Sequence, residues 1–232
     1  MTDLSMKNIL VMGASSGIGK AVAEYLAPKV KELVTVSRSS SPHGQWIQAD
    51  VTKTEDIRNL KHVLKDRAID ALLYLGGTWE KHAFTPGYDF EASPDEETQH
   101  VLNVNLLGPI RMIQTLLPNL GKSGNPKIIL MGALVRDHPF QEVANTASKF
   151  GLDGIVKAIR STAKFRERNI GITVIHPGNV ATPEVLNDLH DAGKPPSYAI
   201  PLADMCMMIH CLLSLSNRSN INELQMASML DL

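Results

Sequence analysis

The chain has 232 residues, of which 44% are hydrophobic and 20% charged, values typical of a globular chain and unlike those of a disordered one. Lysine and arginine number 23 against 24 acidic residues, and the resulting net charge of −1 does not indicate a nucleic-acid binder. This length suits one large α/β domain, so we expect residues 1–232 to form a single domain.

Membrane and metal signals are missing from the sequence. The N-terminal segment has no long apolar run, and no window approaches the length of a membrane span. Cys206 and Cys211 lie five residues apart in one apolar stretch, where we expect two buried, unpaired thiols, as in a reducing compartment. No CxxC or HxxxH pair occurs, so no metal site is expected. We therefore expect a cytoplasmic protein that binds neither membranes nor nucleic acid.

Short apolar runs alternate with longer amphipathic stretches along the chain. We predict strands at Asn8–Met12, Leu33–Ser37, Trp46–Ala49, Ala71–Leu75, Lys127–Met131, Ile172–Ile175 and Glu223–Ala227. We predict helices at Ile18–Ala27, Thr54–Asp66, Glu96–Leu120 (interrupted at Gly108-Pro109), Thr146–Arg168 and Leu202–Leu215. This alternation predicts an α/β fold: a Rossmann-type, doubly wound parallel sheet of about seven strands with helices on both faces. Two Gly/Pro-rich segments, Thr85–Pro94 and Pro177–Pro201, are predicted to be loops over a ligand site.

A glycine-rich segment separates the first predicted strand from the first predicted helix. It reads Gly13-Ala14-Ser15-Ser16-Gly17-Ile18-Gly19. In such a segment one glycine permits a tight turn, one lets the backbone approach a pyrophosphate, and one lets the helix pack close to the sheet. The N–H groups at the start of the helix then bind the phosphates, so the segment predicts a dinucleotide site.

Five separated motifs, in the same order along the chain, resemble those of the short-chain dehydrogenase/reductase family. They are Gly13–Gly19, Asp50-Val51, the run Asn103-Val104-Asn105-Leu106-Leu107-Gly108, Ala147-Ser148-Lys149, and the run His176–Pro183 with the sequence HPGNVATP. The resemblance implies that Asp50 and Val51 contact the adenine, and that Gly76 follows the strand beside the cofactor. It also implies that the segment with Pro177, Gly178, Val180 and Thr182 closes over the nicotinamide.

The end of the second predicted strand bears on which dinucleotide is bound. An acidic residue there would bind the ribose hydroxyls of NAD and repel a 2′-phosphate. This chain instead has Ser37, Arg38 and Ser39. A guanidinium flanked by hydroxyls suits a phosphate monoester through charge-assisted hydrogen bonds. We therefore expect NADP(H) to be preferred over NAD(H), although Arg38 as a solvated loop charge is the simpler alternative.

The catalytic positions depart from the family pattern. The resemblance implies that Lys149 is the catalytic lysine and that Asn105 is the relay asparagine. Four residues before Lys149, where the family has its acid–base tyrosine, stands Asn145. Thirteen residues before that, where the family has a serine, stands Gly132. An amide does not titrate near neutrality, and the loss of a positioned general acid typically costs about 10²–10⁴ in rate.

Another side chain is therefore needed if a proton is to be transferred. The candidates that surround the predicted site are Tyr74, His82, Tyr88, His138 and Tyr198. Each has a simpler role as a packing or loop residue. We expect His138 to be the substitute acid, because its strand-to-helix loop overhangs the substrate side. His176 is interpreted as a packing residue at a strand end.

Three functional hypotheses follow. The first is an NADP(H)-dependent oxidoreductase that acts on a small carbonyl or alcohol substrate with a remodelled acid–base site. The second is a catalytically silent NADP(H)-binding sensor or non-catalytic subunit, since both the tyrosine and the serine are replaced. The third is hydride transfer that needs no acid from the protein. The resemblance also implies a homodimer or homotetramer built on the helices Glu96–Leu120 and Thr146–Arg168.

Overall fold

Seven parallel strands form one sheet in the order β3-β2-β1-β4-β5-β6-β7. The structure is a computed structural model that describes residues 3–134 and 141–230. The strands are β1 (Asn8–Met12), β2 (Glu32–Ser37), β3 (Gln45–Gln48), β4 (Ala71–Tyr74), β5 (Lys127–Met131), β6 (Gly171–Pro177) and β7 (Glu223–Met226). Every predicted strand is present, and no strand end differs from its prediction by more than two residues. The predicted doubly wound α/β fold is confirmed.

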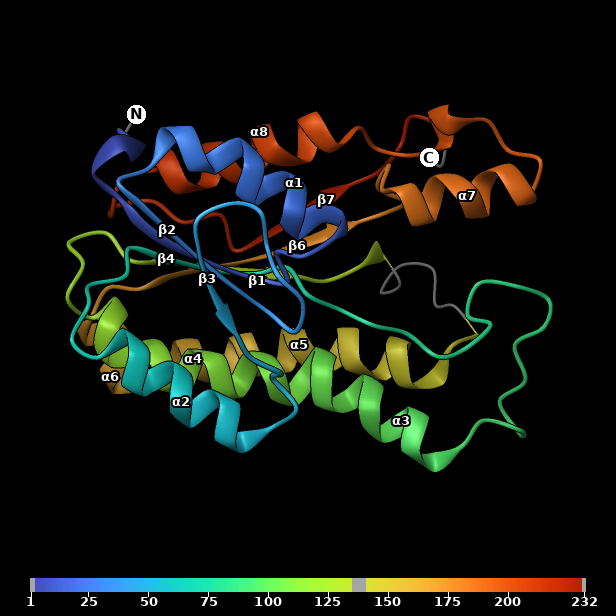
Figure 1. Ribbon diagram of the computed structural model, residues 1–232, viewed down its shortest axis with the longest axis horizontal. Helices are drawn as coiled ribbons and strands as arrows, with labels where there is room; N and C mark the ends of the chain where they lie inside the picture. The colour runs from blue at the N-terminus through green and yellow to red at the C-terminus, as the bar shows by residue number, and fades with distance from the viewer. Residues whose placement is uncertain (1–2, 135–140, 231–232) are drawn as a thin grey trace.

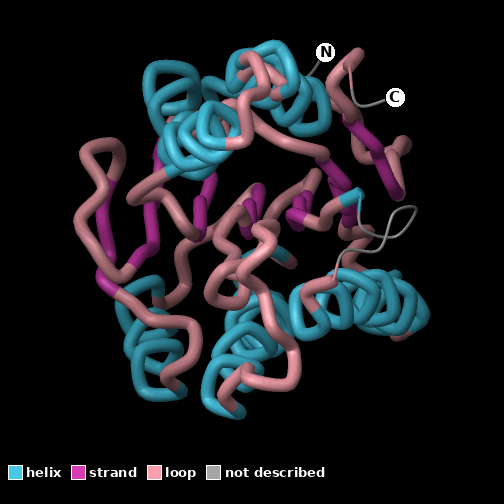
Figure 2. Tube along the Cα trace, turned by 90° about the vertical axis from the view of Figure 1, so that its right-hand side faces the viewer, coloured by secondary structure: helices cyan, strands magenta, loops and turns pink. Residues whose placement is uncertain are grey.

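Helices cover both faces of the sheet, which gives the three layers visible in Figures 1 and 2. One face carries α1 (Gly17–Leu26), α7 (Pro183–Asp191) and α8 (Leu202–Ser214). The other carries α2 (Thr54–Leu64), α3 (Asp95–Leu102), α4 (Gly108–Leu120), α5 (Val143–Ser161) and α6 (Ala163–Glu167). Because successive strand side chains point to opposite faces, Leu72 packs under α4 and α5 while its neighbour Leu73 packs under α1 and α8. Two apolar layers thus hold the strand ends in place.

A π-helical turn, Asn103–Leu107, connects α3 to α4. The buried Tyr74 at the end of β4 reaches under it, and its hydroxyl donates to the Val104 carbonyl at 2.6 Å. A Cβ on Gly108 would collide with that hydroxyl, so the glycine leaves the space that Tyr74 needs. The irregularity therefore lies just before Gly108-Pro109, where the sequence predicts an interruption.

Three details differ from the sequence predictions. The segment Pro177–Pro201 contains α7, because Thr182 caps this helix through its hydroxyl and Pro183 occupies the first turn. The predicted helix Thr146–Arg168 begins at Val143 instead and breaks at Thr162 into α5 and α6. Cys206 is buried as expected, but Cys211 is exposed because it lies on the outer side of α8.

None of the helices in residues 3–134 and 141–230 has both the length and the apolar character needed to cross a bilayer.

Replacing Tyr74 by Phe should lower the free energy of unfolding by about 1–3 kcal/mol, because the Val104 carbonyl loses its buried donor. Urea unfolding measures this change. Tyr25→Phe is the matched control, since the Tyr25 hydroxyl makes no hydrogen bond within the described residues. An equal loss in both variants would contradict the structural role given to the Tyr74 hydroxyl.

Candidate active site

The site begins where β1 and β4 lie side by side at the centre of the sheet. β1 pairs with β2 on one edge and with β4 on the other, so the direction of the strand order reverses between β1 and β4. Just beyond these strands Gly13 adopts a φ of +89°, and a Cβ on it would lie 2.5 Å from the Gly76 nitrogen. The sequence assigns both glycines to the cofactor site, and the structure brings them into backbone contact.

The glycine-rich segment leads directly into α1. Ser16 is the N-cap residue, but its side chain makes no capping hydrogen bond. Gly17 has a φ of +52°, and a Cβ on Gly19 would collide with the Gly13 carbonyl. Ser15 and Ile18 are half-buried beside them. The first N–H groups of α1 are thus left for an anion, and this cradle of small residues fits a pyrophosphate.

The HPGNVATP segment lies against the same glycine-rich segment. The Cγ2 atom of the buried Thr182 is 3.7 Å from the position of a Cβ on Gly17. Val180 is buried and forms a β-bridge with Ile200. The pairing of β6 with β7 includes Pro177, and it continues by one hydrogen bond in which the Gly178 nitrogen donates to the Met226 carbonyl at 2.8 Å. The segment expected to close over a cofactor therefore contacts the glycine-rich turn through Thr182.

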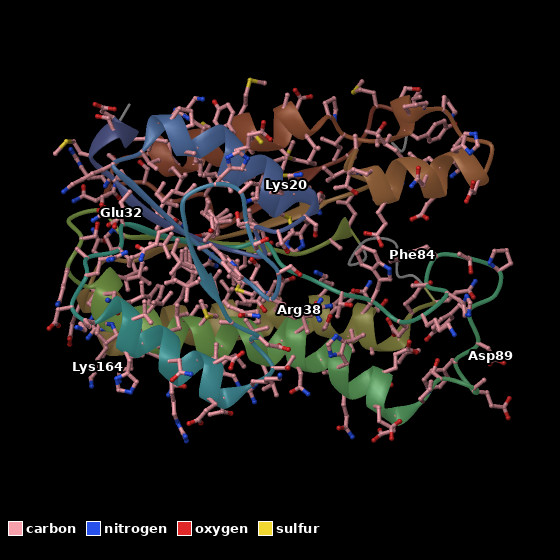
Figure 3. All side chains as sticks on the ribbon, in the orientation of Figure 1. Lys20, Glu32, Arg38, Phe84, Asp89 and Lys164 are labelled. Atoms are coloured by element: carbon pink, nitrogen blue, oxygen red, sulfur yellow. The ribbon has the colours of Figure 1, made fainter. Side chains whose placement is uncertain are left out.

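Arg38, which the sequence predicts to contact the cofactor, follows β2. It is exposed, and Figure 3 shows it at the end of the sheet near α2. The Ser37 hydroxyl donates to the Ser39 carbonyl at 2.7 Å, so this serine shapes the turn that carries Arg38. Burial acts to raise the pKa of Asp50, but hydrogen bonds from Thr52 and the charges of Arg38 and Lys53 outweigh it and hold the pKa below its usual value. Val51 is buried and packs near Gly108.

Asn105, Asn145 and Lys149, three of the predicted catalytic residues, belong to one group of side chains. Asn105 is held by Thr78, whose carbonyl accepts from its Nδ2 at 2.7 Å and whose nitrogen donates to its Oδ1 at 3.0 Å. The same Nδ2 lies 3.1 Å from the Ser148 hydroxyl and 3.5 Å from Asn145 Oδ1. Asn145 is only 4% exposed, and within the described residues its Nδ2 has no hydrogen-bond partner. Asn145 can therefore donate an N–H to a substrate oxygen.

Lys149 lies one helical turn after Asn145 on α5. Its Nζ donates to the Met131 carbonyl at 3.1 Å. A Cβ built on Gly77 would lie 3.7 Å from this Nζ and 3.6 Å from Asn105 Oδ1, so Gly77 adjoins both side chains. Burial lowers the pKa of Lys149 to about 8. The ammonium therefore lies just beyond the end of β4, and its pKa is about one unit above neutral pH.

The space that a serine side chain would take at position 132 is filled by another residue. A Cβ on Gly132 would lie 2.5 Å from His176 Nδ1 and 3.1 Å from Val174 Cγ1. His176 is 2% exposed, with Nδ1 at 3.2 Å from the Ala133 carbonyl and Nε2 at 3.4 Å from Asp153 Oδ1. The packing interpretation of His176 agrees with this burial. The His176 imidazole and a serine side chain at position 132 would therefore exclude each other.

Sequence reasoning missed the carboxylate that holds the start of α5. Glu80 is 2% exposed, and its Oε1 accepts from the Ala144 nitrogen at 2.6 Å and from the Asn145 nitrogen at 3.2 Å. The Tyr88 oxygen accepts from the Val143 nitrogen at 3.2 Å. These contacts are favoured by the positive end of the helix dipole. No local pattern marks Glu80, because its partners are more than 60 residues away.

The candidate acids differ in how they are placed. Burial, and to a lesser extent the charge of Asp50, raises the pKa of Tyr74, whose hydroxyl points under the π-helical turn. His82 is exposed with a φ of 60°. The Tyr88 oxygen contacts the nitrogen of Val143, which is the first residue of α5 and stands two residues before Asn145. The Tyr198 ring faces the Lys194 ammonium at 5.2 Å. His138 lies outside the described residues.

Comparison with known proteins agrees with this geometry. A family model described as short chain dehydrogenase matches residues 7–192. The chain belongs to the short-chain dehydrogenase/reductase family. This match confirms the resemblance seen in the motifs. Members of the family are oxidoreductases that use a nicotinamide cofactor.

Relatives within the family are distant in sequence. An uncharacterized oxidoreductase of Bacillus subtilis, YxnA, is 28% identical over 194 residues, which are 75% of this chain and 52% of that protein. This chain therefore aligns with about half the length of YxnA. The 3-oxoacyl-acyl-carrier-protein reductase FabG of Vibrio cholerae is 26% identical over 201 residues, 80% of this chain and 79% of that protein.

Solved structures of the same fold cover nearly the whole chain. A short chain dehydrogenase from Shigella flexneri, complexed with NADP, has a TM-score of 0.82 at 21% identity. The alignment covers 97% of this chain and 99% of the Shigella chain. One from Escherichia coli, complexed with NADPH, has a TM-score of 0.81 at 22% identity and covers 96% and 98%.

Gly132→Ser should destabilise the protein, because the new Cβ would lie 2.5 Å from His176 Nδ1. Overpacking of this kind typically costs about 1–3 kcal/mol. In a double-mutant cycle His176→Ala should relieve that cost, so that the two substitutions show a favourable coupling. Urea unfolding of the four proteins measures it. Simple additivity would contradict the mutual exclusion of the two side chains.

Proposed function

We propose that this protein is an NADP(H)-dependent oxidoreductase that acts on a small carbonyl or alcohol substrate with a remodelled acid–base site. The observation that carries the proposal is the convergence of Asn105, Asn145 and Lys149 at the carboxyl ends of β4 and β5, beside the glycine-rich segment. A chain that kept the fold alone would not need a partly desolvated lysine at this position.

The residues at the site fit the cofactor and divide its functions. When bound, NADP(H) supplies or accepts a hydride. The first turn of α1 would hold the pyrophosphate, Arg38 the 2′-phosphate, and Lys149 the nicotinamide ribose. Asn145 would donate its amide N–H to the substrate oxygen, and Asn105 keeps Asn145 and the Thr78 backbone in place. Asn145 orients and polarises the carbonyl but supplies no proton, and among the candidate acids we propose His138 for that role.

A silent NADP(H)-binding sensor or non-catalytic subunit is the second candidate. It is favoured by the side chain that fills the space beside Gly132, which is His176, with Asp153 on the far side of its ring. An enzyme of the usual type would keep that space for a hydroxyl. Hydride transfer to an activated double bond, which needs no acid from the protein, is compatible with the same arrangement.

We further propose that residues 1–232 form one cytoplasmic domain that assembles as a homodimer or homotetramer. Leu107, Val143 and Phe150 support the assembly, because these large apolar side chains are exposed around α4 and α5. Exposed apolar groups of this kind are typical of subunit contacts. Neither a membrane, a nucleic acid nor a metal ion is part of the proposal.

Arg38→Ala should weaken NADPH binding by about 1.5–3 kcal/mol, the range for a hydrogen bond to a charged group, and should leave NADH binding almost unchanged. Fluorescence titration with both cofactors measures the difference. Arg58→Ala is the matched control, because Arg58 is an exposed arginine on α2 that pairs with Glu55. A wild-type preference for NADH, or an equal loss for both cofactors, would refute the assignment.

NADPH affinity should fall as the pH rises through about 8, because the free protein then loses the Lys149 proton that the anionic cofactor favours. One linked proton changes the binding constant by at most about tenfold per pH unit. Lys149→Met should bind weakly and lack this pH dependence, whereas the control Lys61→Met, an exposed lysine on α2, should keep it. A wild-type affinity that is flat from pH 7 to 10 would contradict the role of Lys149.

The activity itself is tested by mixing the protein with NADPH and a panel of carbonyl compounds, and by following the absorbance of the reduced cofactor under single-turnover conditions. We expect tight NADPH binding and slow oxidation, with a near-neutral pH dependence that disappears in His138→Ala while cofactor affinity is retained. The exposed His190 provides the control variant His190→Ala. Tight binding without oxidation of NADPH by any compound would favour the silent protein, and an unchanged pH profile in His138→Ala would eliminate His138 as the acid.

A further inference from the structure

A hollow lies at the end of the sheet opposite the proposed cofactor site. It has a volume of about 310 Å³ and is bounded by the first residues of β5 and β6, by α5 and α6, and by the segment 217–222 before β7. Figure 3 shows Lys164 of α6 at this end of the molecule, far from Phe84 at the other. The amino ends of the strands therefore carry a pocket that the proposed reaction does not use.

The lining of this hollow is strongly basic. It includes Lys127, Arg160, Arg166 and Arg218, and within the described residues no aspartate or glutamate lines it. The chain as a whole has a net charge of −1, so positive charge is concentrated here. Neither Arg166 nor Arg218 has an ion-pair partner in residues 3–134 and 141–230. The basic side chains thus face the hollow largely without local neutralisation.

Lys127 is the buried cation of the hollow. It is 6% exposed, and its Nζ donates to the Ser216 carbonyl at 3.2 Å and to the Ser219 carbonyl at 2.9 Å. A third N–H has no partner among the described residues. Gly171 makes room for this ammonium, because a Cβ there would lie 3.2 Å from Nζ. Burial, with the charge of Lys7, lowers the pKa of Lys127, as expected for a cation that lacks a counterion.

Arg160 is fixed in a similar way. Its Nη2 donates to the Ile172 carbonyl at 2.7 Å and to the Asn222 carbonyl at 3.0 Å. Burial lowers its pKa, while the charges of Glu223 and Asp153 act in the opposite direction. These two carboxylates therefore compensate part of the charge on Arg160, and both lie outside the lining of the hollow.

We propose that this hollow binds a compact polyanion, a phosphate ester or a polycarboxylate, as a site separate from the cofactor site. Guanidinium groups match phosphate and carboxylate oxygens through paired hydrogen bonds. An anion would also compensate the desolvated ammonium of Lys127, which now contacts neutral carbonyls. A volume of about 310 Å³ is at the small end of ligand pockets, so the ligand is a small molecule rather than a chain segment.

Isothermal titration calorimetry of the full chain tests this, with inorganic pyrophosphate and citrate as separate probes, with and without saturating NADP⁺. We expect a dissociation constant below about 1 mM for at least one probe in the presence of NADP⁺. The double variant Arg166→Ser/Arg218→Ser should weaken binding about tenfold or more, because it removes two charge-assisted contacts. The matched control is Arg58→Ser/Lys61→Ser, which removes two exposed charges from α2 and should leave binding unchanged.

The two probes identify the chemistry of the ligand: tighter binding of pyrophosphate supports a phosphate ester, and tighter binding of citrate supports a polycarboxylate. Binding of neither probe would overturn the proposal. So would binding that NADP⁺ abolishes and that persists in the double variant, because the anion would then occupy the glycine-rich segment. An equal loss in the double variant and in the control would show a general charge effect, and would overturn the proposal as well. These outcomes do not depend on whether the protein reduces any carbonyl compound.

Discussion

The backbone contact between Gly13 and Gly76 is the constraint on which the rest of the site depends. At position 13 only a residue without a Cβ allows the chain to leave β1 so close to the chain that leaves β4, and the positive φ of Gly13 turns the chain into α1. The start of α1 then faces Thr182, the N-cap of α7. Two helix N-termini thus converge on one place, which favours a bound anion there.

The catalytic half of the site is organised by contacts that span the chain. The loop after β4 supplies Glu80, whose carboxylate accepts from the first turn of α5, and Thr78, whose backbone holds Asn105. Asn145 is therefore positioned from both sides. The same loop exposes Trp79 and Phe84, whose rings meet edge to face at 5.7 Å. These exposed aromatic groups belong to the same loop as Glu80 and form an apolar surface on it.

Glycine at position 132 has a structural counterpart. His176 fills the space at Gly132 and is held between the Ala133 carbonyl and Asp153, which is one turn beyond Lys149 on α5. The end of β5, the end of β6 and α5 are thereby tied together by a buried polar contact. A larger side chain at position 132 would collide with His176, so a substitution there requires changes in several residues and not one.

The sequence by itself determined the strand positions, the parallel fold and the family, because these depend on local apolar periodicity and on glycines at fixed offsets. It also pointed to Asn105, Asn145 and Lys149, because these residues stand at fixed positions within or next to the recognised motifs. The start of α5 at Val143 was not predictable, since its capping acceptors, Glu80 and Tyr88, come from a distant loop. Only the tertiary structure decided that Tyr74 is a packing residue and that His176 occupies the serine position, because both depend on which side chain fills a space between separate elements. The basic hollow around Lys127 is of the same kind: its cations are scattered along the sequence, and only the fold brings them together.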